Sequence, residues 1–275
     1  MSNIRLTATP GPLVRHIALC GLAGFLVLSA PVLADVTSGK AAFEASDYAK
    51  AHSEFLAPAQ AGKAGAQYWM GRLFEGGYGV EKDAARAFKW FEKAGDQGHA
   101  DAQRIVGAFY ERGKGISKSR SKAAQWYQRA ADGGNAKAMR NLGYIYYFGE
   151  GLRRDAKKAA GYFAAAANAG SSRAKFYIGR LYYRGDGVER DLKRAATHFQ
   201  EAARQGEAKA QLFLGRMYAR GESVLRDRVT AYFWLTLAET EEPKRAKILK
   251  ENLEGSLSID EIKSAQERAK RFRPE

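Results

Sequence analysis

Residues 136–171 read AKAMRNLGYIYYFGEGLRRDAKKAAGYFAAAANAGS, and the same skeleton of alanines, glycines and aromatics recurs 36 residues earlier and 36 residues later. Five glycines mark the register of this period: Gly71, Gly107, Gly143, Gly179 and Gly215. A fixed period of this length is typical of a repeat array, in which one small unit stacks on copies of itself. The sequence therefore predicts an elongated array and not a single wound domain.

Each unit is predicted to contain two helices. In the first, an alanine lies five residues before the anchor glycine, an aliphatic residue one before and an aromatic three after, which places all three on one helix face. In the second, alanines lie 16 and 23 residues after the glycine, with a large residue at 19. In the unit of Gly143 these positions hold Ala138, Leu142, Tyr146, Ala159, Tyr162 and Ala166.

The turn between the two helices has its own pattern. A Gly-x-Gly-aliphatic run follows the first helix in four units, and Ser223 replaces the second glycine in the fifth. Glycine suits a positive φ or a close backbone approach. Twelve residues after the anchor glycine comes an Asp, or Ser119 in the second unit, and such residues are predicted to N-cap the second helix.

This combination of alanine, anchor glycine, tyrosine, Gly-x-Gly-Val, Asp, Ala, Trp-aromatic and Ala-Ala resembles the Sel-1-like repeat, a relative of the tetratricopeptide repeat with a longer turn. The resemblance covers residues 64–238. It implies an all-α fold, a right-handed α/α superhelical solenoid of antiparallel helix pairs. It also implies a scaffold for protein partners, often in secretion, cell-envelope or signalling pathways, with no shared catalytic residue.

The first 34 residues are predicted to be a secretory signal peptide. Arg5 and Arg15 precede an apolar run, and Val32-Leu33-Ala34 offers a cleavage motif. The single cysteine, Cys20, lies in this segment, so the mature chain would have neither a disulfide nor thiol chemistry. We therefore expect a periplasmic protein without a membrane span after cleavage, and secretion to the medium is the alternative.

The rest of the chain divides by its periodicity. We predict that residues 35–63 form a truncated N-terminal capping repeat and that residues 64–242 form five repeats. Residues 243–275 are predicted to form a C-terminal helical cap. In the last segment Pro243 suits a first helical position, and Ser258 to Glu261 spell a capping box.

The full sequence carries +15 at pH 7, or +13 without Arg5 and Arg15, and one predicted surface accounts for +8 of this charge. In tetratricopeptide-like arrays the first helix of each pair lines the concave face. Its non-core positions comprise 25 residues, of which 11 are basic and three acidic, and arginine exceeds lysine nine to two. Arginine is favoured where carboxylates are bound bidentately. The predicted partner-binding residues are Arg72, Arg104, Arg112, Arg140, Tyr144, Tyr147, Arg173, Arg180, Tyr183, Arg184, Arg216 and Arg220.

Two alternatives to a binding surface stay open at this stage. The basic face could be only solvated, or its arginines could pair with Glu150, Asp186 and Glu222 in the adjacent turns. The aromatics could pack against the next unit. If the face does bind, the expected partner is a protein with an acidic or carboxylate-bearing segment, and the alternative is an anionic polysaccharide or peptidoglycan. Nucleic acid is not expected, since no base-reading module is visible, and we expect a monomer.

Enzyme signatures are weak. His52, His99 and His198 occupy unrelated repeat positions. Ser-x-x-Lys, the motif of penicillin-recognising serine enzymes, begins at Ser119 and at Ser172, but the companion Ser-Asp-Asn and Lys-Thr-Gly motifs are missing. No His or Cys cluster has metal-ligand spacing. The sequence therefore favours a non-enzymatic protein without cofactor or metal, over a cell-wall hydrolase or penicillin-recognising enzyme.

Overall fold

The computed structural model describes residues 36–275, which form fourteen α-helices and no strand. The predicted signal peptide lies outside the described residues. None of the described helices combines the length and the apolar character that a membrane crossing requires. The helices are α1 (Val36–Glu44), α2 (Tyr48–Gln60), α3 (Ala64–Gly76), α4 (Ala84–Asp96), α5 (Ala100–Arg112), α6 (Arg120–Asp132), α7 (Ala136–Phe148), α8 (Ala156–Asn168), α9 (Ser172–Arg184), α10 (Leu192–Arg204), α11 (Ala208–Arg220), α12 (Arg228–Ala238), α13 (Pro243–Glu254) and α14 (Ile259–Arg271).

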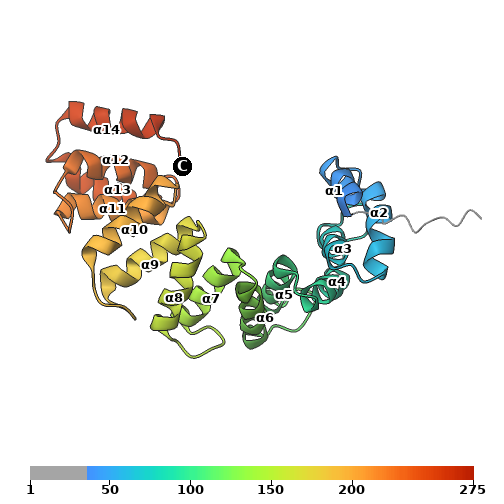
Figure 1. Ribbon diagram of the computed structural model, residues 1–275. Coiled ribbons are helices and arrows are strands. Elements are labelled where there is room, and N and C mark those ends of the chain that lie inside the picture. The colour runs from blue at the N-terminus through green and yellow to red at the C-terminus, as the bar shows by residue number, and fades with distance from the viewer. Residues whose placement is uncertain (1–35) are drawn as a thin grey trace, which may run out of the picture. The chain divides into compact units, whose positions relative to one another are not determined.

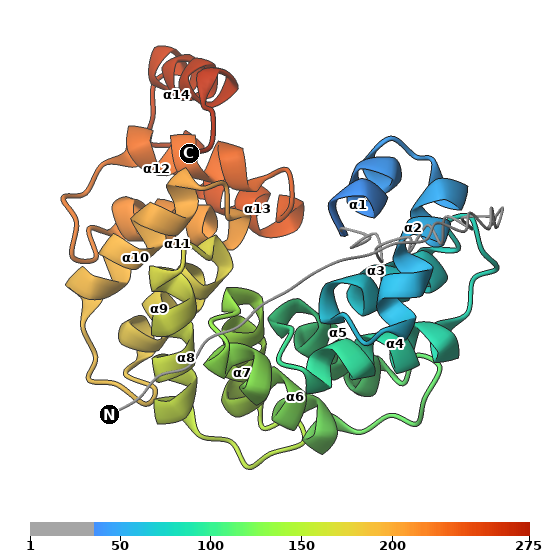
Figure 2. The same ribbon diagram turned by 45° about the vertical axis from the view of Figure 1, so that its right-hand side comes forward.

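The helices pack as antiparallel pairs that succeed one another in sequence order (Figures 1 and 2). Within a unit, α3 packs on α4, and the same holds for α5 with α6, α7 with α8, α9 with α10 and α11 with α12. Each first helix also packs on the second helix of the unit before it, as α5 does on α4. These contacts between sequence neighbours confirm the predicted all-α solenoid of helix pairs.

The core of each unit is a large side chain packed against the anchor glycine. A Cβ added at Gly143 would lie 2.5 Å from Cε1 of Phe163, so the glycine allows the two helices to approach closely. The residues in this position are fully buried, at 0% exposure: Phe91, Tyr127, Phe163, Phe199 and Leu235. They lie 20 residues after the glycine, one position beyond the large residue at 19 in the sequence pattern.

The residue at position 19 has a different neighbour. The ring of Tyr162 stacks on that of Tyr146, the aromatic three after the anchor glycine, with 5.6 Å between centroids. His198 stacks on Tyr182 in the same way, at 5.8 Å. Adjacent helical residues point about 100° apart, so only one of the two large residues can face the glycine.

The two glycines of the turn serve different purposes. Gly185 has a φ of 71° and ends α9 in the left-handed conformation, which suits a residue without Cβ. Gly187 lies against the preceding unit, since an added Cβ would be 2.3 Å from the carbonyl carbon of Ala156. In the fifth unit Ser223 keeps a positive φ of 56°.

The predicted helix starts are confirmed. The side chain of Asp155 accepts from the backbone N–H of Lys158 at 2.9 Å, and Asp83, Ser119, Asp191 and Asp227 cap their helices in the same manner. Pro243 begins α13, and Ser258 with Glu261 forms the capping box of α14.

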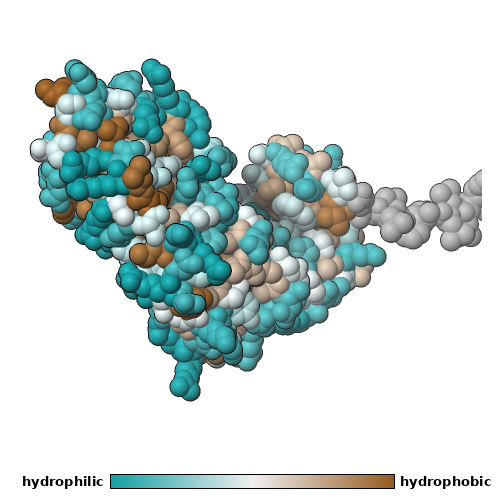
Figure 3. Space-filling view, turned by 60° about the vertical axis from the view of Figure 1, so that its left-hand side comes forward, coloured by the Kyte–Doolittle hydropathy of each residue, from teal (hydrophilic) through white to brown (hydrophobic). Residues whose placement is uncertain are grey.

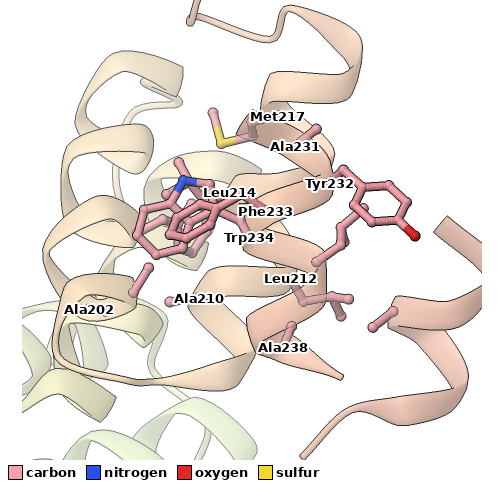
Figure 4. Packing of buried hydrophobic residues seen from close by; sticks show 14 of the residues in the cluster. Ala202, Ala210, Leu212, Leu214, Met217, Ala231, Tyr232, Phe233, Trp234 and Ala238 are labelled. Carbon is pink, nitrogen blue, oxygen red and sulfur yellow. The ribbon is translucent and has the colours of Figure 1, made fainter. Parts of the chain in front are cut away.

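The last three helices share one core. Both α13 and α14 pack on α12. Figure 4 shows Trp234 and Tyr232 on opposite sides of α12, and both side chains are buried. A contact between α13 and α11 places α13 beside the first helix of the last repeat.

Candidate functional site

The predicted partner-binding residues lie on the first helices α3, α5, α7, α9 and α11. We call the non-core side of these helices the first-helix face. Several hollows lie along it, and their lining residues differ in charge. The side of the molecule drawn in Figure 3 is mainly hydrophilic, with small separate hydrophobic patches.

A cavity of about 610 Å³ lies between α9, α11 and α13, and we call it the C-terminal pocket. Its lining holds six cationic side chains and no carboxylate, together with five apolar residues. The cations are Arg180, Arg184, Lys209, Arg216, Arg220 and Arg245, and the apolar residues are Phe176, Leu212, Phe213, Ile248 and Leu249. Arg245 lies 3.8 Å from Glu242, outside the lining, and Arg220 also has a carboxylate neighbour, so the pocket combines a net positive charge with an apolar lining.

Arg180 is held in this pocket by aromatic rings. Its guanidinium carbon lies 5.2 Å from the ring centroid of Tyr147 and 5.5 Å from that of Tyr177. Its Nη2 donates to the hydroxyl of Tyr147 at 2.9 Å. The Nε atom is buried and has no hydrogen-bond partner among the described residues. Cation–π contacts of this kind contribute about 0.5–2 kcal/mol each.

Arg216 repeats this arrangement one unit later. Its guanidinium carbon lies 5.3 Å from the ring centroid of Tyr183 and 4.7 Å from that of Phe213. Both arginines follow their anchor glycine directly, and each meets a tyrosine of the preceding unit. Arg180 and Arg216 thus occupy the same position of consecutive repeats, and each guanidinium group packs against two aromatic rings.

Some of the arginines on the first-helix face have internal carboxylate partners. Arg220 lies 3.3 Å from Glu222, Arg173 lies 3.6 Å from Glu207, and Arg104 lies 3.8 Å from Asp101. All three are partly exposed pairs, which contribute little to stability. Within the part of the chain that the structure describes, Arg180, Arg184, Lys209 and Arg216 form no ion pair.

Three acidic residues in the turns, Glu150, Asp186 and Glu222, were candidates to neutralise the arginines of the first-helix face. Of the three, only Glu222 reaches an arginine of the predicted set, Arg220. Glu150 pairs with Arg120 at 3.6 Å, and Asp186 pairs with Arg154 at 2.6 Å.

The predicted arginines at the other end of the array lie in a mixed environment. Arg72, Arg104 and Arg112 line a hollow of about 310 Å³ between α3 and α5. Glu75 lines the same hollow and pairs with Lys114 at 2.8 Å. The structure therefore does not bring these three arginines together with those of the C-terminal pocket.

The middle of the face is rich in carboxylates. Tyr144 and Arg173 line a hollow of about 450 Å³, which we call the central pocket. Four glutamates line it as well, namely Glu111, Glu150, Glu207 and Glu241. Arg173 also lines a neighbouring hollow with Arg140. Lys209 lines both the central and the C-terminal pocket, so the two adjoin.

The three predicted tyrosines are packed and do not stand free. Tyr147 is 6% exposed. The ring of Tyr144 lies 5.4 Å from that of Phe163 and 4.8 Å from that of Tyr177, and burial raises the pKa of the Tyr144 hydroxyl. Tyr183 donates to Glu222 at 2.8 Å. The rings of Tyr147 and Tyr183 thus pack against Arg180 and Arg216, two arginines of the C-terminal pocket.

The sequence prediction missed the contribution of α13. Arg245, Ile248 and Leu249 line the C-terminal pocket, and the side chain of Ile248 is 59% exposed. Ala246, Leu249 and Leu253 form an apolar stripe at helical spacing in the sequence, but Arg245 and Ile248 lie beside that stripe. Only the contact of α13 with α11 brings them to the pocket.

Two of the residues considered for catalysis, Ser119 and His99, cap helices. The hydroxyl of Ser119 caps α6 by accepting from the N–H of Lys122 at 3.4 Å. His99 caps α5 through Nδ1, which accepts from Ala102 at 3.3 Å. Burial lowers the pKa of both His99 and His198. Over residues 36–275, no group of three or more His, Cys, Asp or Glu side chains is placed to hold a metal ion.

The chain is similar to known helical repeat proteins. The model of the Sel1 repeat matches residues 64–99, 100–135, 136–171, 172–207 and 208–240. A crystal structure of a protective antigen of uropathogenic Escherichia coli strains, with an SLR fold, is 30% identical with a TM-score of 0.78; the match covers 87% of this chain and 53% of the antigen. A crystal structure of a Sel1 repeat protein from Oxalobacter formigenes is 31% identical with a TM-score of 0.75, and the match covers 87% and 97% of the two chains.

The extent of these matches differs. This chain spans about half the length of the Escherichia coli antigen and nearly the full length of the Oxalobacter protein. No curated protein shows significant similarity to it.

Proposed function

Because the chain belongs to the Sel1 repeat family, whose members generally mediate protein–protein interactions, we propose that it is a non-enzymatic adaptor or regulator in the bacterial cell envelope. It binds a protein partner through the first-helix face. The observation that carries this proposal is the C-terminal pocket, whose lining holds six cations and no carboxylate. Arg184, Lys209 and Arg220 are exposed there, so they can reach a partner.

The partner is a protein with an acidic segment. An anionic polysaccharide would satisfy the cations but would leave the apolar lining without a partner. Phe213, Ile248 and Leu249 lie among the cations, and this mixture suits peptide side chains better.

The site of action is the periplasm, after export by a cleaved signal peptide. The support for this part of the proposal is the charged and apolar pattern of residues 1–34.

The test is affinity capture of the tagged mature protein from periplasm and envelope, at low and at high salt. The pocket variant carries Arg184→Glu, Lys209→Glu and Arg220→Glu. The matched control carries Lys89→Glu, Lys157→Glu and Lys193→Glu, three exposed lysines of the second helices, so both variants change the net charge equally. Melting curves check that both variants fold.

We expect wild type and control to retain the same protein, the pocket variant to lose it, and high salt to weaken its capture. Equal capture by the pocket variant would mean that the partner uses another surface. Loss in both variants would mean that general positive charge, and not the pocket, attracts the partner.

A further inference from the structure

The C-terminal pocket is lined by exposed cations and by an exposed apolar side chain. Arg184, Lys209 and Arg220 are exposed cations. Beside them, Ile248 is 59% exposed, although it is a large aliphatic residue and Ala246, Leu249 and Leu253 of the same helix are packed. A ligand that carries charge alone would leave this apolar surface in water. The pocket is complementary to a ligand with both anionic and apolar groups.

We propose that the C-terminal pocket binds an acidic peptide segment with an apolar side chain between its carboxylates. The apolar side chain lies against Ile248 and Leu249 of α13, and the carboxylates meet the cations of α9 and α11. This inference rests on the proposed function and defines the segment of the partner that the adaptor recognises.

The guanidinium groups of Arg180 and Arg216 are ordered before a ligand arrives. Each is packed against two aromatic rings, at 4.7–5.5 Å from the ring centroids. Long side chains normally lose conformational entropy when they bind a ligand. Because the rings already restrict these two arginines, a carboxylate binds them at a smaller entropic cost than it would bind free surface arginines.

The central pocket limits how far the acidic segment extends. Its four glutamates, Glu111, Glu150, Glu207 and Glu241, outnumber its two cations, Arg173 and Lys209, so the lining is net acidic and disfavours further carboxylates. Like charges in contact disfavour a wrong partner or a wrong register. The acidic part of the partner is therefore confined to the space between α9 and α13.

The test uses the purified chain and fluorescein-labelled synthetic peptides. The first peptide has one leucine between two pairs of glutamates; the second has serine in place of the leucine; the third has glutamines in place of the glutamates. We expect the leucine peptide to bind at least about fivefold more tightly than the serine peptide, and the glutamine peptide not to saturate. An alginate oligosaccharide serves as a carboxylate polymer without apolar side chains.

The variant Ile248→Ser tests the apolar contact. Since the side chain is largely exposed, the fold is retained, and a melting curve verifies this. We expect Ile248→Ser to bind the leucine peptide as weakly as wild type binds the serine peptide, and to leave serine-peptide binding unchanged. Lys193→Glu, on the second helix α10, should leave both affinities unchanged apart from a small salt-dependent shift.

Three results would overturn the inference: equal affinity for the leucine and serine peptides, no effect of Ile248→Ser, or alginate binding as tight as that of the leucine peptide. These results would leave the adaptor proposal standing, provided that the pocket variant still loses its captured protein. If the pocket variant instead captures the same protein as wild type does, the adaptor proposal is contradicted, whichever peptides the chain binds.

Discussion

The guanidinium group of Arg180 lies against the ring of Tyr147, 5.2 Å from its centroid, and donates a hydrogen bond of 2.9 Å to the tyrosine hydroxyl. The two residues belong to consecutive units, Tyr147 to α7 and Arg180 to α9. Tyr147 is buried, so a core residue of one unit orients a cation in the pocket of the next.

Tyr147→Phe keeps the ring and removes the hydroxyl. We expect the free energy of unfolding to fall by about 1 kcal/mol, the usual contribution of one hydrogen bond. We also expect affinity for the leucine peptide to fall two- to threefold, an estimate of roughly 0.5 kcal/mol, because Arg180 is less restricted. Urea denaturation and peptide titration measure the two effects. Tyr48→Phe is the control, since within residues 36–275 that hydroxyl makes only a long, exposed contact of 3.4 Å, far from the pocket in sequence.

Gly143→Val tests the glycine register. The new side chain would meet Phe163, whose Cε1 lies 2.5 Å from an added Cβ, and the free energy of unfolding should fall by more than about 2 kcal/mol. The matched control is Gly161→Ala on α8, where an added Cβ meets nothing within 4 Å. That change should raise the free energy of unfolding by about 0.5–1 kcal/mol through helix propensity. An unchanged melting temperature for Gly143→Val would contradict the close approach of the two helices.

Lys63→Asn should stabilise the protein. Lys63 is the N-cap residue of α3 and makes no side-chain capping hydrogen bond. In the equivalent position Asn135 accepts from the N–H of Ala138 at 3.0 Å, with nearly the same backbone angles. The added cap should raise the free energy of unfolding by about 1 kcal/mol. Lys63→Ala removes the same charge without adding an acceptor, so a gain in that variant would assign the effect to charge instead.

His198 makes the fold sensitive to acid. Burial lowers its pKa below the ordinary value of 6.5, against the opposing influence of Glu201, with Lys175 and Arg194 acting in the same direction as burial. The unfolded chain therefore binds more protons, so this contribution to stability is full above pH 6.5 and is lost as the pH falls below it.

His198→Trp should remove this part of the pH dependence. Tryptophan is the residue at the same repeat position in three other units, Trp90, Trp126 and Trp234. Melting temperatures between pH 8 and about pH 5 should decline less steeply in the variant. His99, whose pKa is also lowered by burial, accounts for some of the remaining slope. A decline identical to that of wild type would show that His198 is not responsible.

The helices and their ends could be predicted because they depend on near neighbours in the chain. The cap at Asp155 and the capping box of Ser258 and Glu261 each join residues three apart. The period of 36 residues likewise follows from comparing one segment of the chain with the next. Such signals need no knowledge of distant contacts.

The position of the core ring could not be predicted in the same way. Tyr162 and Phe163 are adjacent, and both are large enough to fill the space beside Gly143. The pattern favoured Tyr162, whereas Phe163 is the residue that faces the glycine. Two neighbouring aromatics give equal signals in a sequence, and the rotation of the packed helix decides between them.

The sequence by itself determined that the chain is an array of helix pairs with a basic first-helix face, because period and composition can be read along the chain. Only the tertiary structure decided which charges act together. It joined Arg245 and Ile248 of α13 to Arg184 and Arg220, and it placed Glu207 and Glu241 in the adjoining pocket. Electrostatic and apolar interactions depend on distance through space, which for residues of different helices is set by packing and not by separation in sequence.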